Sequence, residues 1–130
     1  MIKVRADLGN LAAMSDQIVR AAETSGIGLT LLPVHYQFAG LDKGPLGPGQ
    51  RRFGTDPDGF ARLLDAAMTA MRRLPPDCRT GLAPHSLRAV APGQLATLWD
   101  LSPGPVHMHL AVQSGEGAQV QAALGAPPVE

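Results

Sequence analysis

The 130-residue chain lacks the sequence features of disulfide-rich, nucleic-acid-binding and membrane-spanning proteins. It has a single cysteine, Cys78, which excludes a framework of disulfides within one chain. Its 11 Lys and Arg balance its 11 Asp and Glu, so no strong charge favours nucleic acid or an anionic membrane surface. No apolar run approaches the roughly 18 residues of a membrane span, and residues 1–7 lack the core of a signal peptide. We therefore expect a single cytoplasmic domain over residues 1–130, with no nucleic acid and no membrane among its partners.

Glycine and proline, by contrast, are abundant, with 15 and 12 residues, and they predict many short connections. Between these breaks, apolar spacing predicts four helices and three strands in alternation. We expect Asp58 to cap the second helix and Pro92 to lie in the first turn of the third. The predicted helices span residues 10–25, 58–74, about 92–99 and 116–124, the strands span residues 27–36, 81–83 and 105–112, and residues 39–57 form a long loop.

This alternation is typical of an α/β protein with a parallel sheet. The first strand is an almost continuous apolar run, which predicts burial on both faces, although Pro33 removes a backbone donor. A closed (β/α)8 barrel needs about 250 residues. A barrel interpretation therefore makes this chain part of one, with about three parallel strands and flanking helices.

Two histidines form the sharpest local signal. Alternation along residues 105–112 places His107 and His109 on one face of a strand end, where two imidazoles can converge on a metal ion. A zinc site needs further ligands, and the candidates are His85, His35, Asp56 and Asp58. The alternative is a pair of histidines hydrogen-bonded in a polar strand end.

His85 and Arg88 follow the second predicted strand, at the end where parallel sheets bind ligands. Arg88 can clamp a carboxylate through two hydrogen bonds. The alternative is a surface arginine beside a histidine that caps the next helix. Tyr36 ends the first strand and has the same two interpretations, as a ligand contact or as a buried tyrosine with one backbone partner. A lone loop cysteine such as Cys78 is usually inert.

Several blocks along the chain together resemble the formimidoylglutamate deiminase family of the amidohydrolase superfamily, in order from about Arg5 to Glu130. They are Gly26–Val34, Tyr36–Gln37, Gly49–Phe53, Ala83–Val90 and Val106–Ala111. The resemblance implies a metal-dependent (β/α)8 barrel that hydrolyses the C=N bond of N-formimidoyl-L-glutamate, an intermediate of histidine breakdown. It also implies that the chain is an internal part of such a barrel.

The same resemblance implies roles for individual residues. His109 matches the metal-ligand histidine of the His-x-His-x-Ala-Glu strand, and His107 matches its non-ligand neighbour. His85 and Arg88 match substrate-contacting residues, and Tyr36 matches a substrate-pocket tyrosine. We take His85 and His107 as candidate catalytic residues, Tyr36 and Arg88 as candidate substrate-binding residues, and His109 as the candidate metal ligand.

One departure bears directly on activity. Val112 occupies the position of the family's catalytic glutamate, and an isopropyl group cannot carry a proton. With His109 as the one family ligand in the sequence, zinc is the implied cofactor but lacks its full ligand set. Three parallel strands would also leave an apolar face open, so we expect a homodimer or larger homo-oligomer that completes the fold and the site.

Three functions follow from these observations. The first is a hydrolase of amidohydrolase type that has lost native deiminase activity and retains weak or altered hydrolysis in a site built by oligomerisation. The second is a non-catalytic homo-oligomer in which the same residues are relics. The third is a module that binds a small anionic ligand.

Overall fold

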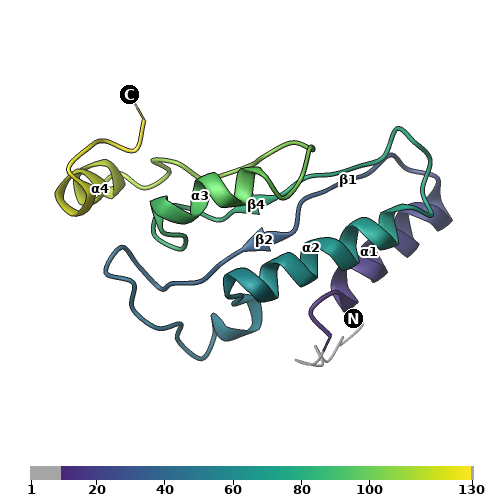
Figure 1. Ribbon diagram of the computed structural model, residues 1–130, viewed down its shortest axis with the longest axis horizontal. Coiled ribbons are helices and arrows are strands. Elements are labelled where there is room, and N and C mark those ends of the chain that lie inside the picture. Colours follow the sequence, from purple (N-terminus) through teal and green to yellow (C-terminus); the bar gives the residue numbers. More distant parts are fainter. Residues whose placement is uncertain (1–9, 130) are drawn as a thin grey trace.

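The computed structural model describes residues 10–129, and in it two of the helices lie along one side of a narrow parallel sheet (Figure 1). Helices α1 (Ala13–Ser25) and α2 (Pro57–Met71) lie side by side, whereas α3 (Pro92–Trp99) and α4 (Glu116–Leu124) follow toward the other end of the molecule. None of the helices in residues 10–129 is long and apolar enough to cross a membrane.

The sheet consists of three parallel extended segments. The first segment contains β1 (Thr30–Leu31) and β2 (Val34–His35), and the second contains β3 (Arg79–Thr80) and β4 (Ala83–Pro84). β1 pairs with β3, and β2 pairs with β4. A parallel bridge between Leu82 and Val106 adds the third. The expected α/β fold with parallel strands is therefore confirmed, but the strands are shorter than expected.

Proline explains the interruption of the first predicted strand, residues 27–36. Pro33 has no N–H to donate, so regular pairing stops between β1 and β2 while its carbonyl still accepts a 2.9 Å hydrogen bond from Ala83 N. The expected burial on both faces is also wrong. Leu31, Pro33 and His35 are buried, whereas Thr30 is exposed and Val34 is 42% exposed, because among residues 10–129 the helices cover only one face.

Two further expectations need correction. The cap of α2 is Asp56, whose side chain accepts a 2.6 Å hydrogen bond from Gly59 N, and Asp58 lies within the first helical turn. The predicted strand over residues 105–112 is regular only at the Val106 bridge. Ala111 then adopts a positive φ of 52°, which ends the extended segment before α4. The predicted loop at residues 39–57 contains a short 3₁₀ helix, η1 (Arg51–Phe53).

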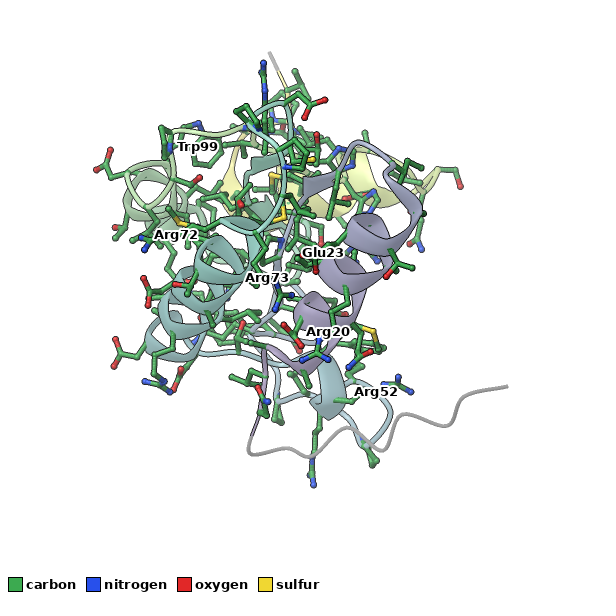
Figure 2. All side chains as sticks on the ribbon, turned by 90° about the vertical axis from the view of Figure 1, so that its right-hand side faces the viewer. Arg20, Glu23, Arg52, Arg72, Arg73 and Trp99 are labelled. Carbon is green, nitrogen blue, oxygen red and sulfur yellow. The ribbon has the colours of Figure 1, made fainter. Side chains whose placement is uncertain are left out.

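The core lies between the helices and the covered face of the sheet, in two clusters. The first joins α1, β1 and α2 through Val19, Leu31 and Met71, and the second joins α2, the second strand segment and α3 through Phe60, Leu82 and Leu98. An ion-pair group outside the core holds α1 to the turn that follows α2, since Asp16 pairs with Arg20 at 2.8 Å and with Arg73 at 3.0 Å. Figure 2 shows Arg20, Glu23 and Arg73 near one another, with Trp99 apart on α3.

Candidate functional site

The carboxyl ends of the three parallel segments bring four predicted site residues into one row of rings. The Tyr36 ring centroid lies 4.6 Å from that of His85, His85 lies 5.3 Å from His109, and His109 lies 5.6 Å from His107. We call Tyr36, His85, His109 and His107 the ring row. Each contact is edge-on, the geometry that aromatic rings favour over a face-to-face stack.

The backbone ladder sets this row. His85 N donates to His35 O at 3.0 Å, and His109 N donates to His85 O at 3.1 Å, so the three segments end in register. Side chains alternate between the faces of an extended segment. The prediction that His107 and His109 share a face is therefore confirmed, and both side chains are exposed.

Tyr36 is tied to the long loop that follows β2. Gln50 Nε2 donates to the Tyr36 hydroxyl at 3.2 Å, and Gln50 Oε1 accepts from Gly47 N at 2.9 Å. The half-buried tyrosine therefore finds its hydroxyl partner in a side chain rather than in the backbone. Its hydroxyl oxygen lies at the boundary between the ring row and residues 47–50.

His85 is the partly buried member of the row whose charge state is perturbed. Its Nδ1 shares a 3.0 Å hydrogen bond with Ser86 Oγ. Burial, followed by the charges of His109 and Arg88, lowers the pKa of His85 below its ordinary value, and Glu116 opposes that shift. A neutral imidazole at neutral pH can accept a proton from a ligand or from water.

Arg88 lies against the start of α4. Its Nη1 donates to Gln113 Oε1 at 3.3 Å, and its Nε lies 3.9 Å from Oε1 of the buried Glu116. Arg88 also lines a shallow cavity, wide open to solvent, of about 670 Å³ between residues 39–42 and α4. The cavity wall includes Asp42 and Gln119 and is otherwise largely apolar. A guanidinium at such a wall is suited to bind a carboxylate.

His35, Asp56 and Asp58 do not join the ring row, so their selection as further metal-ligand candidates is wrong. His35 points to the opposite face, where it is fully buried, shares a 2.8 Å hydrogen bond with Thr55 Oγ1 and packs against Phe60. Asp56 caps α2, and Asp58 is in its first turn. Within residues 10–129, no group of three or more His, Cys, Asp or Glu side chains is placed to hold a metal ion.

Sequence reasoning missed Gln50, Gln113 and Glu116. Gln50 lies in the block Gly49–Phe53 that carries the resemblance, but nothing in that block indicates its contact with Tyr36. Gln113 carries no sequence signal, because its contact with Arg88 depends on a loop that returns to a distant strand end. Glu116 had a weak signal, since an acidic residue in the first turn of a helix is favoured by the helix dipole. That signal predicts a stabilised helix and does not indicate a contact with Arg88.

The chain is similar in sequence and structure to part of two larger proteins. No protein-family model matches the chain. A curated formimidoylglutamate deiminase from Pseudomonas aeruginosa is 42% identical over 123 residues, which cover 92% of this chain and 26% of that protein. The crystal structure of an amidohydrolase from Brucella melitensis superposes with a TM-score of 0.85 and 44% identity, over 92% of this chain and 27% of that one. The chain thus spans about a quarter of the length of each.

Proposed function

Since this chain is a relative of formimidoylglutamate deiminase and of a structurally characterised amidohydrolase, we propose that it forms the ligand-recognition part of a C–N hydrolase site, which binds a small anionic ligand and turns it over weakly. The observation that carries the proposal is the ring row at the ends of three adjacent parallel segments. The charge of Arg88 contributes, after burial and His109, to the lowered pKa of His85. Ligands bind at this end of parallel sheets.

Each residue has a definite role in this proposal. Arg88 pairs with a carboxylate of the ligand, because its planar guanidinium matches the two carboxylate oxygens. Tyr36 contacts the ligand through its hydroxyl, which Gln50 orients. His85 accepts a proton, and the exposed His107 is the second group for proton transfer. Formimidoylglutamate, for which the relative is named, supplies both the carboxylates and the C=N bond that such a site would use.

Weak turnover follows from Val112. This residue stands where the deiminase motif has its catalytic glutamate, and its side chain is 69% exposed. Loss of a general acid–base typically lowers a rate by about two to four orders of magnitude. Glu116 does not replace it, because its side chain is 1% exposed and one of its oxygens already accepts from Val112 N.

The metal of the amidohydrolases does not fit a complete site within residues 10–129. His109 is the residue that would contribute a ligand, and the nearby His85 and His107 rings pack edge-on against it. A zinc site needs three or four ligands. We therefore assign His85 and His107 their proton-transfer roles without a metal-dependent step.

A second copy of the chain would complete the site in this proposal. The open face of the sheet carries Thr30 and Val34, and the exposed His107 and His109 lie at its carboxyl end. Pairing of two such faces would cover apolar surface and bring polar groups of two chains together. A symmetric homo-oligomer is therefore the partner that we propose.

The rate of ammonia release from N-formimidoyl-L-glutamate tests the catalytic part. We expect the purified chain to release ammonia at least about a hundredfold more slowly than a formimidoylglutamate deiminase assayed alongside it. Comparable rates would contradict the role given to Val112. The second candidate, anion binding without turnover, is favoured by the same valine, and it is supported if ammonia release stays at the background rate while L-glutamate raises the melting temperature.

A further inference from the structure

The carboxylate of Glu116 is buried at the start of α4 with only one of its oxygens satisfied. Its side chain is 1% exposed. Oε2 accepts from Val112 N at 3.0 Å and from Gln113 N at 3.4 Å, which closes the turn before the helix. Oε1 is buried and has no hydrogen-bond partner within residues 10–129. A buried charged oxygen is costly unless a cation or donor faces it.

Arg88 supplies that cation. Its Nε is likewise buried without a hydrogen bond in the described part of the chain, and it lies 3.9 Å from Glu116 Oε1. Nη1 donates to Gln113 Oε1 at 3.3 Å, on the same side. Two nitrogens of the guanidinium are therefore directed to the turn that Glu116 closes.

Among residues 10–129, the remaining donors of Arg88 have no such contact. A guanidinium carries five N–H groups, and the contacts with Glu116 and Gln113 involve one on Nε and one on Nη1. The side chain is 30% exposed and lines the cavity between residues 39–42 and α4. A ligand carboxylate in that cavity would meet the free donors of a guanidinium that is already held in place.

We propose that Glu116 is a positioning residue, which fixes the Arg88 guanidinium for a ligand carboxylate in the cavity between residues 39–42 and α4. The identity of the ligand rests on the proposed function, whereas the link between Glu116 and Arg88 does not. A long, flexible arginine loses less conformational freedom on binding when a neighbour already restricts it. Glu116 thus acts on ligand affinity without touching the ligand.

The Glu116→Gln variant distinguishes the positioning of Arg88 by Glu116 from the closure of the turn before α4. The glutamine carbonyl oxygen can still accept from Val112 N and Gln113 N, but the charge that faces Arg88 is lost. The probe is L-glutamate, titrated by calorimetry into the wild-type chain, Glu116→Gln, Arg88→Ala and the double variant. We expect Glu116→Gln to raise Kd about tenfold and to have no further effect when Arg88 is absent.

Glu23→Gln is the matched control, because Glu23 also faces an arginine, Arg73 at 4.0 Å, but lies on α1. It should leave Kd unchanged. A Glu116→Gln variant that melts earlier yet binds L-glutamate as tightly as the wild type would show that Glu116 only closes the turn. An equal effect in the presence and absence of Arg88 would also overturn the proposal.

A measurement without ligand tests the role of Glu116 independently of the proposed function. If the wild-type chain does not bind L-glutamate, the proposed function fails, and exchange of the Arg88 Nε hydrogen, followed by NMR, decides the role of Glu116. We expect this hydrogen to exchange at least about tenfold faster in Glu116→Gln than in the wild type, because the carboxylate partner is gone. Equal exchange rates would overturn the positioning role.

Discussion

The imidazole of His35 shows how one residue joins β2 to α2 on the face of the sheet opposite to the ring row. It belongs to β2, shares a hydrogen bond with Thr55 just before α2, and packs on Phe60 within α2. Burial lowers the pKa of His35, while Gln94 on α3 and the charge of Asp56 partly oppose the shift. The neutral imidazole is thus the form that the folded chain favours.

Folding stability should therefore fall in mild acid. The unfolded chain takes up a proton on this imidazole near pH 6.5, whereas the folded chain resists it, so the stabilisation is present above about pH 6.5 and is lost as the pH falls below it. One such group changes the free energy of unfolding by at most about 1.4 kcal/mol per pH unit. We expect His35→Gln to reduce the slope of unfolding free energy against pH between about pH 5 and 7, as measured by urea denaturation. Equal slopes in the two proteins would contradict this explanation.

At the scale of single residues, the grouping of the candidate residues was more predictable from the sequence than the side chains that contact them. The convergence of Tyr36, His85 and His109 could be predicted, because parallel segments end at one edge of a sheet. The pairing of Arg88 with Glu116 could not, since it depends on the turn where Ala111 adopts a positive φ. The position of His35 on the face opposite to the ring row could be known only from the strand register, because a shift by one residue exchanges the two faces of a strand.

The third extended segment, which carries His107 and His109, lies in close backbone contact with the second segment. A Cβ atom on Gly104 would overlap the carbonyl oxygen of Thr80, and one on Gly81 would overlap the carbonyl oxygen of Pro105. Backbone atoms of paired segments cannot move apart without breaking the hydrogen bonds from Leu82 N to Pro105 O and from His107 N to Leu82 O. Glycine at these two positions therefore allows the segment that carries His107 and His109 to dock.

Gly104→Ala should destabilise the chain by at least about 2 kcal/mol, because the added methyl group meets backbone rather than a movable side chain. The matched control is Gly93→Ala in the first turn of α3, where a Cβ atom meets nothing within 4 Å. That change should stabilise the chain by up to about 1 kcal/mol through helix propensity. Urea denaturation at one pH compares the two variants, and equal effects would contradict the close approach.

Helices were predicted more closely than strands, for physical reasons. The bounds of α4 match the expected residues 116–124. The end of α1 at Ser25 also matches, and Gly26 after it adopts the left-handed conformation that glycine often adopts at a helix end. The cap at Asp56 had a signal in Pro57, since proline favours the first helical position. Strand lengths had no comparable signal, because they depend on partners elsewhere in the chain and on the missing donor at Pro33.

At the scale of the whole molecule, the fold has one covered face and one open face. The helical layer buries Leu31 and His35, whereas Val34 between them in β2 remains 42% exposed. An open face with an exposed Val34, beside short strands, favours association. The chain of residues 1–130 should therefore form a homo-oligomer through this face.

Light scattering after size-exclusion chromatography tests this association. We expect a mass of at least twice the 13.6 kDa of one chain. Val34→Asp should shift the protein toward the monomer, because it places a charge on the face that would be covered. Leu124→Asp is the control, since Leu124 is also 42% exposed but lies on α4. A monomeric wild type, or the same shift in both variants, would contradict the prediction.

The central claim is that Arg88 makes this chain a receptor for a small carboxylate ligand, and calorimetric titration of L-glutamate tests it most directly. Arg88→Ala removes the guanidinium at the cavity, whereas Arg72→Ala removes an exposed arginine at the end of α2. We predict saturable binding to the wild type and to Arg72→Ala, and binding at least about tenfold weaker to Arg88→Ala, because a charge-assisted pair with the carboxylate is lost. Equal affinity in all three proteins, or no binding to the wild type, would contradict the claim.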